Sequence, residues 1–126
     1  MEALKIEPSD DSPEVILDQQ GNRFEITGKS LPEDVVDFYQ PVLDWLGEYR
    51  ANPNPRTEFS FKLIYFNTAS SKLILDILMI FEEMVEENHD ILVKWLSLKS
   101  DEDMQEAGRE YEEMIDVPFE HVTYEM

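Results

Sequence analysis

The chain has 126 residues, of which 29 are acidic and 10 are basic, and its net charge is −19 at pH 7. A surface field of this sign disfavours nucleic-acid binding and attachment to anionic membranes, and it fits docking to a partner with a basic face. The absence of cysteine excludes disulfides, thiol catalysis and thiolate metal sites, and the length predicts a single domain over residues 1–126.

The first 30 residues have the pattern of β-structure. Residues 14–18 and 23–27 flank the Gly-containing turn 19–22, which predicts a β-hairpin. In the second of these strands, Phe24 and Ile26 alternate with polar residues, as expected when one face is buried. Residues 4–6 are expected to add a short edge strand.

The first helix is expected to begin at Ser30. The stretch Ser-Leu-Pro-Glu over residues 30–33 has the spacing of a capping box, with proline in the first turn. Apolar residues then follow at helical spacing, up to a stop at the two prolines within residues 52–55. Pro41 lies inside this helix, and we expect it to kink the helix or divide it near residue 37.

Strands and helices alternate through the rest of the chain. Strands are predicted over residues 57–66, 91–96 and 119–124, separated by a helix that ends near Asn88 and another that begins at Ser100. This order predicts an α/β fold: a mixed sheet of four to five strands with three main helices.

Few residues have the spacing of a catalytic or metal site. His89 and His121 are far apart and have no ligand-spaced partner. Residues 101–112 resemble a calcium loop, but Glu106 takes the place of the required glycine, so an acidic helix start is the better interpretation. Nucleotide-binding and nucleophile motifs are missing as well. We therefore expect no metal, no cofactor and no enzymatic activity.

The segment 65–72, Tyr-Phe-Asn-Thr-Ala-Ser-Ser-Lys, lies where a buried strand ends and a helix begins. One interpretation is structural: Asn67 or Thr68 caps the helix, and Ser70 or Ser71 supports its first turn. The other is functional, because a phosphorylated hydroxyl is tolerated at a helix N-terminus and would disrupt an interface formed by that surface.

The topology and the position of Thr68 resemble the anti-sigma-factor antagonist (STAS) domain. In that domain, a Ser or Thr between a central strand and the next helix is phosphorylated. The usual Asp-Ser-x-Gly-type sequence is missing here.

A closer resemblance is to the SiaC family of bacterial regulatory phosphoproteins. It is carried by Asp44-Trp45, by the stretch Leu-Ile-Tyr-Phe-Asn-Thr-Ala-Ser at residues 63–70 with a second serine at 71, by the Val-Lys-Trp stretch at 93–95, and by Pro118-Phe119. The resemblance implies a STAS-like fold and a partner switch that is not an enzyme. In the family, a dedicated kinase phosphorylates the threonine, a PP2C-type phosphatase reverses this, and the unmodified form activates a diguanylate cyclase.

This resemblance assigns the phosphorylated position to Thr68. It implies that Asn67, Ser70 and Ser71, which match the neighbours of that threonine, take part in partner binding. Ala69 departs from the family pattern, in which serine is frequent.

Two other functions fit the residues. The chain is interpreted alternatively as an anti-sigma-factor-antagonist-like module or as an unphosphorylated acidic adaptor. Binding of such an adaptor to a basic surface should weaken steeply with salt. A small enzyme that uses paired carboxylates would require a pocket of carboxyl groups with perturbed pKa values. The sequence contains no recognisable leader peptide and no recognisable membrane-spanning segment. We therefore expect a cytoplasmic protein.

Overall fold

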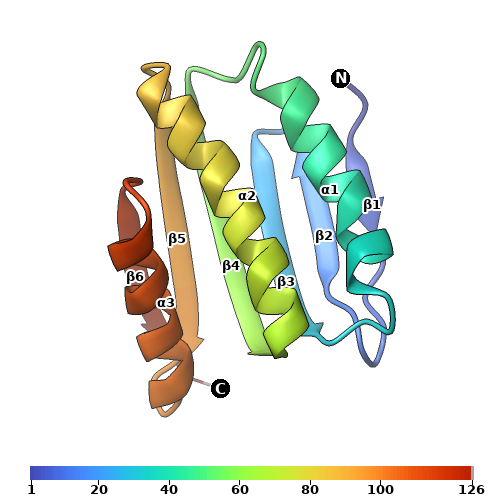
Figure 1. The fold of residues 1–126 in the computed structure, drawn as a ribbon, viewed down its shortest axis with the longest axis vertical. Coiled ribbons are helices and arrows are strands. Elements are labelled where there is room, and N and C mark those ends of the chain that lie inside the picture. The colour runs from blue at the N-terminus through green and yellow to red at the C-terminus, as the bar shows by residue number, and fades with distance from the viewer. Residues whose placement is uncertain (126) are drawn as a thin grey trace.

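A sheet of six strands runs through the whole structure, a computed structural model that describes residues 1–125 (Figure 1). The strands lie side by side in their order along the chain: β1 (Leu4–Ile6), β2 (Glu14–Asp18), β3 (Arg23–Ser30), β4 (Arg56–Phe66), β5 (Asp90–Leu98) and β6 (Phe119–Tyr124). Strands β1 to β3 pair antiparallel, whereas β3 to β6 pair parallel.

Three helices connect the parallel strands. They are α1 (Val35–Tyr49), α2 (Thr68–Glu86) and α3 (Glu102–Met114), and all three cover the same face of the sheet (Figure 1). The predicted α/β domain with a mixed sheet and three helices is confirmed. The sheet has six strands and not four to five, because both of its edge strands form: Lys5 pairs with Ile16, and Phe119 pairs with Val93.

The core lies between the sheet and the helices. In β4, alternate residues from Thr57 to Leu63 are buried beneath the helices, while Glu58 and Lys62 face outward. Trp45 on α1 and Trp95 on β5 are both buried. Within residues 1–125, none of the helices has the length and hydropathy needed to cross a bilayer.

The start of α1 differs from the prediction. Its N-cap is Asp34, whose carboxylate accepts a hydrogen bond from the amide of Asp37 at 3.1 Å. Ser30 is instead the last residue of β3 and is completely buried. The strand continues to Ser30 through a register shift between Gly28 and Lys29. Gly28 has a φ of +119°, which glycine adopts far more readily than residues with a side chain.

The expected division of the first helix near residue 37 is also wrong, because α1 is continuous from Val35 to Tyr49. Proline removes the hydrogen bond that residue 41 would make to the carbonyl of Asp37. Both residues are exposed, so water can reach this part of the helix. Burial of the opposite face, through residues such as Val42 and Leu46, holds the helix together.

Candidate functional site

The five residues from Asn67 to Ser71 form the first turn of α2, directly after β4. Asn67 is the N-cap: its backbone is extended, and its side-chain oxygen accepts a hydrogen bond from the amide of Ser70 at 2.8 Å. Thr68 is the first residue of the helix and is exposed. The structural interpretation of Asn67 as a cap is therefore confirmed, and it leaves Thr68 accessible.

The electrostatic setting of this turn differs from that of α1 and α3. The first turn of α3 contains Glu102 and Asp103 and that of α1 contains Asp37, whereas the first turn of α2 has no acidic residue. The N-terminus of a helix also carries a partial positive charge. In a chain with a net charge of −19, the start of α2 is thus a place where an added negative charge meets little local repulsion.

Ser70 faces inward and is completely buried. Its hydroxyl donates to the carbonyl of Ser30 at 2.9 Å and accepts from the Ser30 hydroxyl, also at 2.9 Å. Since the Ser30 hydroxyl uses its proton in this way, the hydroxyl of Tyr39 must be the donor in its 2.6 Å contact with Ser30. The carbonyl of Ser30 also accepts the amide of Asn67 at 3.0 Å. The end of β3 and α1 therefore hold the turn that presents Thr68.

The other side of the turn is tied to α3. The hydroxyl of Ser71 donates to the carbonyl of Thr68 at 2.7 Å, and the carbonyl of Ser71 accepts the hydroxyl of Tyr111 at 2.8 Å. Burial raises the pKa of Tyr111 well above its usual value, so this phenol stays a donor at neutral pH. The Thr68 turn is thus held by hydrogen bonds to Ser30 of β3, which Tyr39 of α1 bonds in turn, and to Tyr111 of α3.

The network of Tyr39, Ser30 and Ser70 was not expected from the sequence. The sequence predicts Ser30 to begin a helix cap, whereas in the structure it is the last residue of β3. The sequence does contain a pattern that predicts this position. Phe24, Ile26, Gly28 and Ser30 follow one another at intervals of two residues, so in a continuous strand Ser30 lies on the same buried face as Phe24 and Ile26.

Replacing Tyr39 with phenylalanine tests this network. Burial raises the pKa of Tyr39 to about 12, although the hydrogen bond with Ser30 opposes the shift. The phenol is thus protonated in the folded state at pH values where the unfolded chain, with a pKa of about 10, ionises. Its contribution to stability is complete below about pH 10 and is lost as the pH rises through about 12.

We expect Tyr39→Phe to lower the free energy of unfolding by about 1 kcal/mol at neutral pH and to make its decline between about pH 10 and 12 shallower. Urea denaturation across this range measures both effects. Tyr65→Phe is the matched control, because Tyr65 is half exposed and its hydroxyl makes no hydrogen bond to another described residue. Equal behaviour of the two variants would contradict the role assigned to Tyr39.

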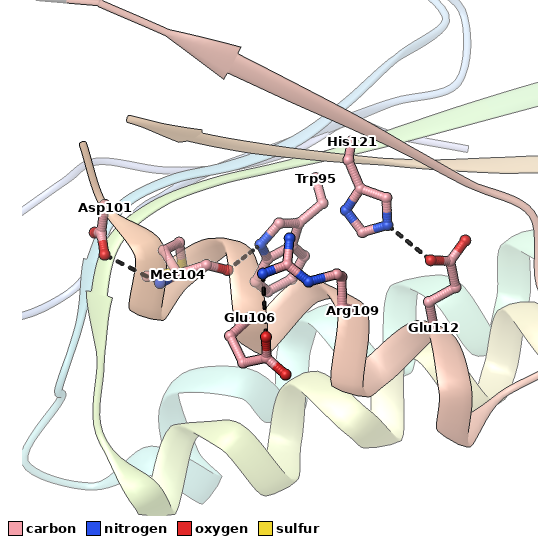
Figure 2. A network of polar contacts seen from close by, with 7 residues as sticks. All are labelled: Trp95, Asp101, Met104, Glu106, Arg109, Glu112 and His121. Atoms are coloured by element: carbon pink, nitrogen blue, oxygen red, sulfur yellow. Dashed lines mark hydrogen bonds and ion pairs between the residues drawn. The ribbon is translucent and has the colours of Figure 1, made fainter. Parts of the chain in front are cut away.

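His121 and the calcium-like segment have structural positions. His121 on β6 contacts Glu112 on α3 at 2.9 Å (Figure 2). Asp101 is the N-cap of α3, and its carboxylate accepts a hydrogen bond from the amide of Met104 at 3.0 Å, so the interpretation of this segment as an acidic helix start is confirmed. Among residues 1–125, no group of three or more potential ligands is placed to hold a metal ion.

Comparison with known proteins places this arrangement in a family. The family model for SiaC family regulatory phosphoproteins matches residues 6–124. An uncharacterized protein of Pseudomonas aeruginosa (strain UCBPP-PA14) is 29% identical over 119 residues, which is 94% of each chain.

Solved structures agree with this match. The crystal structure of apo-SiaC from Pseudomonas aeruginosa has a TM-score of 0.89 at 27% identity, covering 98% of this chain and 100% of that one. A crystal structure of the diguanylate cyclase SiaD in complex with its activator SiaC, from the same organism, matches with a TM-score of 0.91 at 27% identity, covering 96% and 99%. The chain belongs to the SiaC family of regulatory phosphoproteins.

Proposed function

We propose that this protein is a regulatory partner switch without enzymatic activity, which docks on a diguanylate cyclase and is released when Thr68 is phosphorylated. The observation that carries the proposal is the exposed Thr68 in the first turn of α2. The choice of target rests on the similar structure in which SiaC is the activator of a diguanylate cyclase.

The proposed mechanism is local. Phosphorylation adds a charge of about −1.5 to −2 at neutral pH, together with three acceptor oxygens. The α2 N-terminus tolerates this charge in the free protein because its first turn lacks carboxylates. In a docked complex the same charge would lose its water, and this desolvation together with the bulk of the phosphate would oppose binding. Phosphorylation therefore leaves the fold intact and removes the docking surface.

The neighbouring residues have different proposed roles. Asn67 and Ser71 are partly exposed and flank Thr68, so we assign them to the partner-binding surface. Ser70 is buried, so in this conformation its part in partner binding is to position the turn through Ser30. The switch also needs a cognate protein kinase and a phosphatase, for which a PP2C-type enzyme is the expected class.

The proposal is tested by phosphopeptide mass spectrometry on affinity-tagged protein from its own cells. We expect a phosphate on Thr68 in the wild type and not in a Thr68→Ala strain, and we expect a protein with a diguanylate cyclase domain to co-purify with the unmodified form. A Thr68 peptide that stays unmodified under several growth conditions would contradict the switch. Phosphorylation without a cyclase among the co-purifying proteins would contradict the choice of target.

A further inference from the structure

Two adjoining hollows lie beside the Thr68 turn. One, of about 400 Å³, lies between α2 and α3, and the other, of about 350 Å³, continues past the end of β4 toward the start of α3. Phe66 and Ala107 line both, so the two form one depression, which we call the α2–α3 groove. Its apolar lining includes Ile64, Tyr65, Phe66, Leu75, Ala107 and Met114.

Several apolar side chains that line the groove are exposed to solvent. The exposed fractions are 52% for Ile64, 52% for Tyr65 and 61% for Met114. Contiguous exposed apolar side chains on an otherwise charged surface are typical of protein interaction sites. The groove also reaches the proposed switch: Ser71 lines it, and the Ser71 hydroxyl is hydrogen-bonded to the carbonyl of Thr68.

The groove exists because α3 is held down on the sheet. The indole N–H of Trp95 on β5 donates to the carbonyl of Met104 at 2.9 Å, and His121 on β6 contacts Glu112 (Figure 2). Gly108 packs so closely on Trp95 that an added Cβ would clash with the indole ring. Tyr111 is buried at the floor and reaches the carbonyl of Ser71 on α2. The groove is therefore preformed.

The charges around the groove indicate what kind of segment it fits. Asp101, Asp103 and Glu110 are among its lining residues, against a single cation, Lys72. Within the part of the chain that the structure describes, neither Asp103 nor Glu110 belongs to an ion pair. A second copy of this chain would bring further negative charge to these acidic residues, which form the rim of the groove. A segment with both apolar and basic side chains could instead pack on the apolar floor and pair with the acidic rim.

We propose that the α2–α3 groove is the anchoring site for an apolar, basic segment of a protein partner. The inference rests on the docking function proposed above, but it does not depend on whether Thr68 is phosphorylated. The apolar side chains fill the floor between Phe66 and Met114, and the basic side chains face the α3 rim. Thr68 lies at the edge of this contact, where a phosphate would be desolvated by an arriving partner.

The probe is a labelled amphipathic helix of about 18 residues, with leucines on one face and lysines on the other. A scrambled peptide of the same composition measures binding due to charge alone. Fluorescence anisotropy at about 0.15 M ionic strength gives the affinities, and amide chemical shifts give the location. We expect the amphipathic peptide to bind more tightly and to shift amides in residues 64–75 and 101–114.

The decisive variant is Ala107→Lys, which places a cation on the groove floor, and its matched control is Val36→Lys on α1, where the side chain is 55% exposed. We expect the first to weaken binding by about tenfold and the second by less than about twofold. Met114→Lys, at a more exposed position, gives the same readout if Ala107→Lys does not fold.

Three results would overturn the proposal: equal affinity for the two peptides, equal effects of the groove and control variants, or shifts spread over the acidic surface of α1 and α2. Sedimentation of the protein alone tests a second copy as the occupant. A dimer that Ala107→Lys dissociates would also overturn the proposal. The peptide-binding experiment does not require phosphorylated protein. Failure of the peptide to bind would therefore contradict only the groove proposal, whereas an unmodified Thr68 in cells would contradict only the phosphorylation switch.

Discussion

Thr68→Glu is expected to weaken binding to the co-purifying cyclase by about 100-fold or more, because an unpaired charge buried in an interface costs on the order of 3 to 5 kcal/mol. Thr68→Ala should bind within about threefold of the wild type, since it adds neither charge nor bulk. Isothermal titration calorimetry with the purified cyclase measures both. The helix should remain intact in both variants, because its cap is the side chain of Asn67.

The matched control for Thr68→Glu is Thr123→Glu on the edge strand β6, where the threonine is also exposed. It adds the same charge to the same acidic protein on a different element and should leave the affinity within about threefold. If both glutamates weakened binding equally, the effect would be one of net charge and the acidic-adaptor interpretation would be favoured. Wild-type affinity of Thr68→Glu would contradict blocking by charge.

The largest loss of stability is expected from Trp95→Ala. Trp95 is fully buried, its ring lies 5.5 Å from that of Phe61 and 5.6 Å from that of Tyr111, and its N–H bonds Met104. Removing such a side chain costs about 3 to 5 kcal/mol and would free α3 from the sheet. Urea denaturation measures the loss, and a fall of less than about 1 kcal/mol would contradict the assigned role of Trp95.

A pair of glycine substitutions separates packing from helix propensity. Gly108→Ala should destabilise the protein by about 1 to 3 kcal/mol, because the new Cβ would meet the Trp95 ring. Gly47→Ala, inside α1 with nothing within 4 Å of the added Cβ, should stabilise it by about 0.5 to 1 kcal/mol. Changes of the same sign would show that the contact with Trp95 is not the cause.

Helices and strands could be predicted from the sequence wherever one side of the element is buried, because burial of one side gives the apolar residues a regular spacing. The alternation along β4 and the apolar stripe of α2 each have one side facing the core, and both elements form where they were predicted. The start of α1 was not readable, because a capping-box pattern at Ser30 competes with a strand that a positive-φ glycine extends. Local patterns cannot decide between two such alternatives when tertiary pairing with β4 determines the outcome.

The position of the candidate site could be predicted from the sequence, whereas the hydrogen bonds that hold the Thr68 turn in place could not. An Asn-Thr pair between an apolar strand and a helical stripe identifies the exposed turn from the sequence alone. The hydroxyl network behind it joins residues 30 and 70, and its partners are set by how β3, α1 and α2 meet in space. The α2–α3 groove likewise depends on the fit of Gly108 against Trp95.

The order of the strands also bears on how the chain folds. Each strand pairs with the strand that precedes it in the sequence. A newly formed strand therefore does not need a partner from a remote part of the sequence in order to join the sheet. Folding rates rise as contacts become more local, and domains form progressively during synthesis. We expect the β2–β3 hairpin and the unit β3–α1–β4 to assemble while later residues are still being made. β6 is the last strand to be synthesised, and its arrival completes the surface on which α3 rests.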